Sequence, residues 1–208
     1  KEIVANRIFD STEQKDNTYR LYLRGRNINR YVINPNFKQW ISYGKWLAEP
    51  RKEELFNDKE KIVIRQTGDS LTAALDKESF LCLNNMHTIN IENKTFDIKY
   101  LIGLINSSLL NYYFQYLNPE KGEALAEVKA TNVKRLPIKE VSMLKQSIIS
   151  NLVQTILNLY KKLQNYIENS DDWNSIKSEV KKTDKKIDEE VYKLYGLTKE
   201  EIKIVEAK

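Results

Sequence analysis

Two apolar seams with heptad spacing in the last third of the chain constrain its fold more than any other feature. The first seam alternates steps of four and three residues and comprises Ile149, Val153, Ile156, Tyr160, Leu163 and Ile167. The second comprises Trp173, Ile176, Val180, Thr183, Ile187, Val191 and Leu194. Because each seam needs a partner face and the capping residues 169–172 separate the two, the pattern predicts an antiparallel helical hairpin. A short third helix is expected from Thr198, whose hydroxyl can form a capping box with Glu201.

The first two thirds of the chain carry the shorter period of β-strands. Residues 19–24 alternate between two faces, which places Tyr22 on the same face as its neighbouring arginines. Residues 61–65 form a β-branched run that ends in a turn. Residues 79–83 and 86–91 are expected to form a strand pair joined by a short connection.

From Asp97 the apolar period becomes helical. Asn106-Ser107 interrupts this period, and Ser107 is expected to cap a second helix. The whole pattern predicts an α+β fold. A mixed-strand domain over residues 1–138 precedes an α-helical hairpin over residues 139–208, which is expected to act as a spacer and docking arm.

The positive charge of the chain lies in its first 170 residues. The formal net charge is +5, an excess compatible with nucleic-acid binding, whereas residues 171–208 hold ten acidic and nine basic side chains. Between residues 19 and 31 there is no acid, and the arginines there are Arg20, Arg24, Arg26 and Arg30. Such a cluster either faces an anion or forms a solvated strand face, and the sequence leaves both interpretations open.

Composition excludes several classes of site. A single cysteine, Cys82, rules out an internal disulfide, and its leucine neighbours predict an inert thiol in a core strand. With one cysteine and one histidine there is no zinc-ligand cluster. Apolar runs are too short to span a membrane and no secretory signal is visible, so a cytoplasmic location is expected. The chain begins at Lys1 without Met, which favours a fragment of a larger parent protein.

The string that follows residues 61–64 is the strongest candidate for reading nucleic acid. A strand that delivers Arg65 and Gln66 to a glycine turn places a bidentate reader of guanine beside a reader of adenine. The alternative is a loop in which Arg65 pairs with Asp69 and Thr67 caps the turn. The sequence leaves these two interpretations near parity.

Catalytic interpretations are weaker. Glu120, Glu127 and Lys129 imitate the acidic pair and lysine of a metal-dependent nuclease, but Glu-x-Lys is common in a chain with 30% charged residues. A solvated charged stretch is therefore favoured. The sequence of residues 34–37 superficially resembles an amino-methyltransferase loop, but Asn replaces the required second proline. His87 has no recognisable nucleophile beside it.

An ordered series of sequence blocks resembles the TaqI-like C-terminal specificity domain over about residues 18–140. The blocks are Arg30-Tyr31-Val32-Ile33, the sequence WISYGKWL at 40–47, EPR at 49–51, KIVIRQTGD at 61–69, YLIGLINSSLLNYYF at 100–114 and KRLPI at 134–138. The tail at 183–198 is also similar to the terminus common in such proteins. Domains of this kind are target recognition domains of type IIG restriction-modification enzymes and related bacterial adenine-specific DNA methyltransferases.

The resemblance implies a module that reads a short sequence of double-stranded DNA. A methyltransferase domain, often accompanied by a nuclease domain, would be supplied upstream or by another subunit of the same system. S-adenosylmethionine and Mg²⁺ would belong to those domains, so we expect no cofactor and no enzymatic activity in this chain by itself.

Candidate contacts follow from combining the resemblance with residue chemistry. Phosphate contacts are expected from Arg24, Arg26, Lys45, Lys129 and Lys134. Base contacts are expected from Arg65, Gln66, Asn85 and His87, with Thr67 in the same string. Two other interpretations stay open, namely the metal-dependent nuclease and an assembly protein whose helical arm binds partners without contacting DNA.

Overall fold

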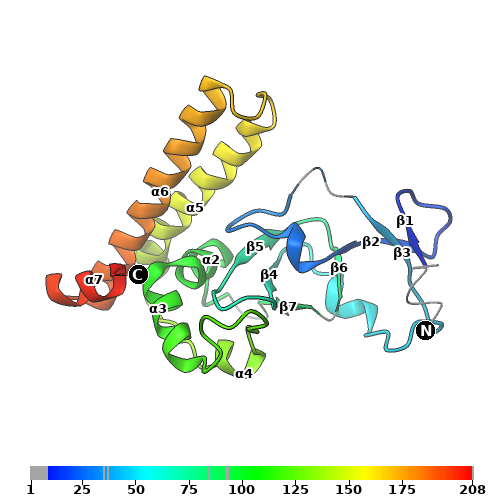
Figure 1. Cartoon of the computed structure of the whole chain (residues 1–208), viewed down its shortest axis with the longest axis horizontal. Helices are drawn as coiled ribbons and strands as arrows, with labels where there is room; N and C mark the ends of the chain where they lie inside the picture. The colour runs from blue at the N-terminus through cyan, green and yellow to red at the C-terminus, as the bar shows by residue number, and fades with distance from the viewer. Residues whose placement is uncertain (1–8, 35, 37, 84, 92–93, 208) are drawn as a thin grey trace.

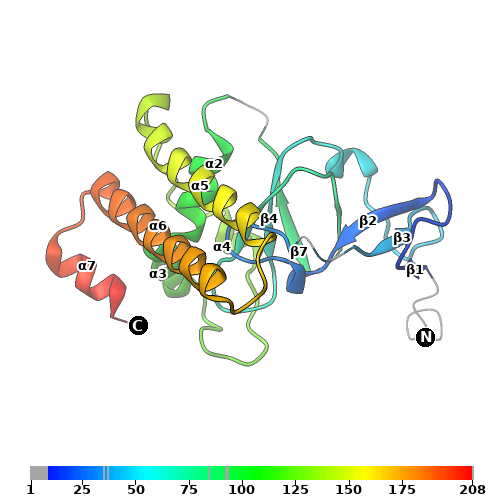
Figure 2. The same cartoon turned by 90° about the horizontal axis from the view of Figure 1, so that it is seen from above.

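The computed structural model describes residues 9–34, 36, 38–83, 85–91 and 94–207. Strands fill one side of the molecule and helices the other, and two long helices project side by side from the body (Figures 1 and 2). This arrangement confirms the α+β class predicted from sequence.

The first sheet extends from the middle of the molecule to the end opposite the helical hairpin, and its strands β1, β2 and β3 lie at the right of Figure 1. Its strand order is β1 (Asp10–Ser11), β3 (Trp40–Ser42), β2 (Tyr19–Leu23) and β6 (Leu81–Cys82). The prediction that Tyr22 shares a polar face with the arginines is wrong, because Tyr22 is fully buried. Its hydroxyl lies 3.0 Å from Asp10 Oδ2 and 2.9 Å from Gln39 Oε1, donates its single proton to one of them and accepts from the Arg24 guanidinium at 2.7 Å, so the ring can enter the core.

The second sheet is antiparallel and occupies the centre of the molecule. Its strand order is β5 (Ala73–Asp76), β4 (Lys61–Arg65) and β7 (Met86–Ile89). The expected pairing of residues 79–83 with 86–91 is wrong: β6 pairs with β2 in parallel, and β7 pairs with β4. The buried side chains of β6 join the core around β2, while β7 completes the second sheet beside β4.

The helices after this sheet confirm the predicted interruption. Helix α2 (Ile98–Asn106) ends at Ser107, and α3 (Ser108–Leu117) begins there. The Ser107 side chain accepts a hydrogen bond from Leu110 N, as a cap should. A short helix, α4 (Ala130–Val133), follows after a loop.

The predicted helical hairpin is present. It consists of α5 (Met143–Leu163) and α6 (Asp171–Tyr195), and Ser170 caps α6 by accepting from Trp173 N. The predicted first seam is too long, because α5 ends at Leu163 and Ile167 lies beyond it, 83% exposed. Gly196 ends α6 with a φ of 74°, and α7 (Lys199–Glu206) starts with the Thr198–Glu201 capping box. None of the described helices is long and apolar enough to cross a membrane.

The hairpin shares a hydrophobic core with the central sheet. Ile149 and Val153 of α5 and Ile187 of α6 belong to the same buried cluster as Ile62 and Ile64 of β4. Packing thus continues across residue 138, and the division of the chain at that position stays a prediction.

Candidate nucleic-acid interface

Three segments meet at the end of β4. The Gln66 N–H donates to Asn85 O at 3.1 Å, and Gln66 O accepts from Val128 N at 2.6 Å. Thr67 forms an antiparallel bridge with Glu127. Backbone pairing therefore fixes five of the predicted residues in one region, which we call the polar edge: Arg65, Gln66, Thr67, Asn85 and His87.

His87 is held by the third segment of the polar edge. Its Nε2 lies 2.6 Å from the carbonyl oxygen of Val128. Because a carbonyl only accepts, the proton belongs on Nε2. The same residue lines a cavity of about 370 Å³ together with Thr88, Ile89, Asn90, Ala130, Val133 and Lys134.

Arg65 keeps its hydrogen-bonding capacity. Its side chain lies against Gly25, where a Cβ would stand 2.9 Å from Arg65 Cγ, so glycine is needed for this approach. Nε is buried, and no acceptor among the described residues reaches it. The alternative pairing with Asp69 is wrong, because Asp69 instead accepts from Ser70 Oγ at 2.9 Å and Gly122 N at 3.3 Å.

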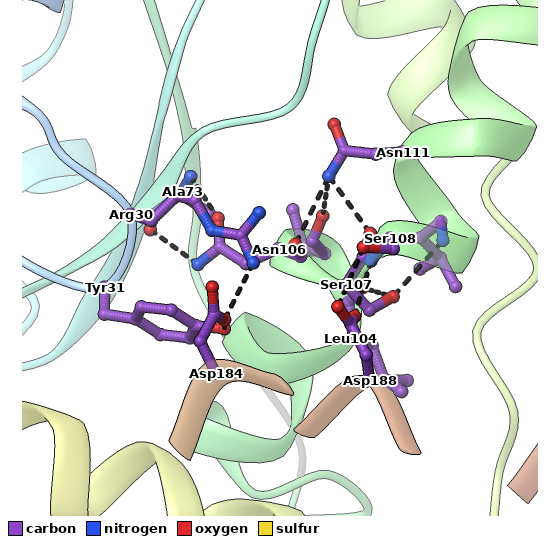
Figure 3. Close-up of polar contacts among 12 residues, drawn as sticks. Arg30, Tyr31, Ala73, Leu104, Asn106, Ser107, Ser108, Asn111, Asp184 and Asp188 are labelled. Atoms are coloured by element: carbon purple, nitrogen blue, oxygen red, sulfur yellow. Dashed lines mark hydrogen bonds and ion pairs between the residues drawn. The ribbon is translucent and has the colours of Figure 1, made fainter. Parts of the chain in front are cut away.

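Two buried asparagines bind the backbone at the start of β5 and just before it, and Figure 3 shows Asn106 beside Ala73. Asn106 accepts from Ala73 N and donates to Ala73 O, both at 2.9 Å. Asn111 Oδ1 accepts from Leu71 N at 2.7 Å. These two positioning residues were not predicted, although an asparagine inside an apolar helical pattern is a signal that its amide must find a buried partner.

The arginine cluster between residues 19 and 31 is largely neutralised within the chain. Arg20 pairs with Glu53 at 2.6 Å, Arg24 with Asp10 at 2.7 Å and Arg30 with Asp184 at 2.8 Å. Figure 3 shows Arg30 and the hydroxyl of Tyr31 converging on Asp184 of α6. The four arginines therefore do not form one unpaired cationic surface.

The predicted phosphate contacts lie in different surroundings. Arg24 faces Asp10, whereas Arg26 is exposed in the short helix η1 (Gly25–Asn27), directly after the glycine that contacts Arg65. Lys134 is exposed at the end of α4, on the cavity that His87 lines. Lys45 is exposed three residues after β3, a strand that lies at the end of the molecule away from the helical hairpin (Figure 1). Their roles stay predictions.

Lys129 and the acids around it form a closed network. Lys129 pairs with Glu120, and this hydrogen bond raises the pKa of the lysine and lowers that of Glu120. Glu120 also accepts from Glu127 N at 2.9 Å, and Gln66 Nε2 lies 3.4 Å from Glu127 Oε2. In the described part of the chain, no three His, Cys, Asp or Glu side chains are grouped as metal ligands. The methyltransferase-like string at 34–37 lies partly outside the described residues.

The comparisons with known proteins agree with the family resemblance of the sequence blocks. A family model described as the TaqI-like C-terminal specificity domain matches residues 20–138, more than half of the chain. The solved structure of the type IIL restriction-modification enzyme MmeI in complex with DNA is similar, with a TM-score of 0.64 and 15% sequence identity. The match covers 91% of this chain and 31% of that chain, and at this identity it shows a shared fold. No curated protein matches the chain in sequence.

Proposed function

The chain belongs to the family of TaqI-like C-terminal specificity domains. We propose that it recognises a short sequence of double-stranded DNA for a restriction-modification enzyme. MmeI, the structural neighbour, was solved with DNA, and this chain spans only 31% of that enzyme's length. In our proposal the remaining length of the parent protein, or a second subunit, supplies an adenine methyltransferase and, in systems that cut, a nuclease. Those domains would bind S-adenosylmethionine and Mg²⁺ in the cytoplasm, and this chain by itself would have no activity.

Base reading is assigned to the polar edge. Arg65 stands at the end of a strand that is buried along residues 61–64, and Gln66 is fixed by two backbone hydrogen bonds. A guanidinium fork can bind guanine O6 and N7, and a glutamine amide can bind adenine N6 and N7. Because the backbone is rigid here, little conformational entropy would be lost on binding.

Phosphate binding is assigned to exposed cations. Arg26, Lys129 and Lys134 are exposed near the polar edge, where Lys129 directly follows the Val128 backbone that pairs with Gln66, and Lys45 is exposed away from it. Such contacts set the register of a reader on the duplex without carrying sequence information themselves. Arg24 would join them only by exchanging Asp10 for a phosphate.

One observation carries the proposal: Arg65 sits on a fixed edge with no carboxylate partner among the described residues. To test it, the chain is used to enrich duplexes from a random pool, and affinity is measured for the enriched duplex and a scrambled one. Arg65→Ala should cost about 1–3 kcal/mol on the enriched duplex and little on the scrambled one. The exposed Arg51→Ala serves as the matched control and should leave the discrimination unchanged.

Equal weakening on both duplexes would show that Arg65 contacts phosphate rather than a base. Failure to enrich any duplex would contradict the proposed function itself. Salt dependence separates the two kinds of contact, because Lys134→Ala should weaken both duplexes alike and reduce the salt slope by about 1.

A further inference from the structure

The loop between α3 and α4 exposes a leucine at the corner of a turn. Residues 123–126 form this turn, which is closed by Ala126 N donating to Glu123 O at 3.2 Å. Leu125 is its third residue and is 90% exposed. Turn corners favour Gly, Asn, Asp and Ser, so local structure does not call for leucine here. Single exposed leucines are common on proteins, and the position of this one is what distinguishes it.

The backbone that carries Leu125 is fixed to the turn after β4. Gly68 N donates to Ala126 O at 2.8 Å, and Gly122 N donates to Asp69 Oδ2 at 3.3 Å. Ala126 is only 4% exposed and anchors the turn in the core. Leu125 is therefore presented to solvent from a rigid support, one residue before the Ala126 carbonyl that accepts from Gly68, and Gly68 directly follows Thr67 of the polar edge. In Figure 2 the green loop between α3 and α4 extends out from the body.

Leu125 has no contiguous apolar surface around it within its own loop. A protein interface needs a contiguous apolar core, but within residues 118–129 Leu125 is the single large apolar residue that is exposed. The charged residues nearest to it in the loop are Glu123 and Glu127, which are both acidic and exposed, and Lys129 pairs with Glu120. An isolated apolar side chain beside hydrogen-bonding readers matches a duplex, whose base edges are polar and whose base stack is apolar. Architectural proteins insert single leucines between base pairs in this way.

We propose that Leu125 inserts into the base stack beside the base pairs that Arg65 and Gln66 read, and unstacks one step. This inference rests on the proposed function and extends it, because unstacking is easiest at flexible pyrimidine–purine steps. Leu125 thus confers a sequence preference at a step that no polar side chain has to contact. It is a specificity-determining residue that acts through the deformability of DNA.

The test uses the full chain and the duplex that it enriches from a random pool. 2-Aminopurine, an adenine analogue that fluoresces when unstacked, replaces single bases along the duplex in turn. Wild-type protein should raise the fluorescence several-fold at one step next to the bases protected by Arg65. Leu125→Ala should abolish this rise and weaken binding about tenfold, whereas Leu125→Met should restore most of both. Leu144→Ala, at a similarly exposed position on α5, is the matched control and should behave as wild type.

The outcomes separate this inference from the function on which it rests. If a duplex is enriched and Arg65→Ala loses discrimination, but fluorescence is the same with wild type and Leu125→Ala, the insertion is refuted and the reading function stands. If Leu125→Ala weakens binding without any fluorescence rise in wild type, Leu125 packs on the groove surface and the insertion is again refuted. If no duplex is enriched, both proposals are refuted.

Discussion

Burial controls the ionisation of single side chains in the sheet that contains β6. Cys82 is the buried last residue of β6, and desolvation raises the pKa of its thiol to about 12. Since the thiolate is the nucleophile, a thiol with this pKa is inert at neutral pH. The inert core cysteine predicted from the flanking leucines is therefore what the structure contains.

Alkylation of Cys82 should require unfolding. In native buffer at about pH 8, iodoacetamide should leave the thiol unmodified over an hour, because both its access and its ionisation are blocked. In denaturing urea the same reagent should modify it completely, and mass spectrometry counts the adducts. Fast labelling of the native chain would show that β6 opens readily.

Asp188 offers a test of pH dependence. Burial raises the pKa of its carboxyl, partly offset by hydrogen bonds from Ser108 N at 2.7 Å and Ser108 Oγ at 2.8 Å. In the unfolded chain the carboxyl titrates near its ordinary value of 3.8. Between 3.8 and the raised pKa this carboxyl therefore binds more protons in the folded state, and the contribution of Asp188 to stability falls as the pH rises through that range.

Asp188→Asn removes this titration while keeping both contacts to Ser108, because an amide can accept from the N–H and donate to the hydroxyl. We expect the free energy of unfolding of the variant, relative to wild type, to increase between pH 4 and pH 7. Urea denaturation at a series of pH values measures it. Glu189→Gln, an exposed neighbour on α6, controls for the loss of one negative charge. A constant difference across the series would contradict the assigned cause.

For single side chains, the sequence predicted the element on which a residue lies better than it predicted the residue with which it pairs. The run at 61–66 correctly predicted a strand that delivers Arg65 and Gln66 to a turn. It could not show that Arg24 and Arg30 are paired, because Asp10 and Asp184 lie 14 and 154 residues away. Ion pairs of this length depend on the tertiary arrangement and leave no local pattern.

Among the elements, helices were predicted well and strand partners poorly. Helix ends carry local signals, and the caps at Ser107, Ser170 and Thr198 were readable in the sequence. The pairing of β6 with β2 spans about 60 residues and is set by burial of both strands in one core. Side-chain contacts between α2 and β5, and between α2 and α5, likewise leave no local pattern in the sequence. Each of these two contacts can be tested by a substitution.

Asn106→Ala should destabilise the chain markedly. The substitution leaves the buried N–H of Ala73 without a partner, which costs about 1–3 kcal/mol, whereas the Ala73 carbonyl oxygen keeps its hydrogen bond from Tyr31 N at 2.8 Å. We expect the free energy of unfolding to fall by about 1–3 kcal/mol in urea denaturation. Asn151→Ala, on the exposed face of α5, is the control and should change it by less than about 0.5 kcal/mol. A small loss for Asn106→Ala would mean that β5 finds other partners.

Gly103→Ala should also destabilise, although alanine is the better helix former. A Cβ at this position of α2 would stand 2.4 Å from Ile149 Cγ2 and 3.2 Å from Val153 Cγ2, so α5 would have to move. Overpacking of this kind costs about 1–3 kcal/mol, more than the gain of about 1 kcal/mol in helix propensity. In the background of Ile149→Ala the same substitution should cost much less. Additive losses in this double-mutant cycle would exclude the clash as the cause.

For the molecule as a whole, β4 and β5 join two hydrophobic cores. Ile62 and Ile64 face the cluster that includes α2, α5 and α6, while Val63 and Ala74 face the cluster around β2 and β6. The central sheet is therefore covered on both faces, which explains why residues 61–64 are fully buried. The sequence placed a boundary at residue 138 because the apolar period changes there, but a change of period does not reveal which surfaces pack together.

This shared sheet predicts that the strand-rich part and the helical hairpin unfold together. Tryptophans report on both, since Trp40 belongs to β3 and Trp173 to α6. In a Trp173→Phe variant the remaining tryptophan fluorescence follows the unfolding of the first sheet. In a variant with Trp40→Phe and Trp46→Phe it follows the unfolding of the hairpin. Their urea midpoints should coincide, and adding Ile187→Val should lower both by the same amount, equivalent to about 0.5–1.5 kcal/mol. Two separated midpoints, of which only the hairpin's responds to Ile187→Val, would instead establish residue 138 as a boundary between independently stable units.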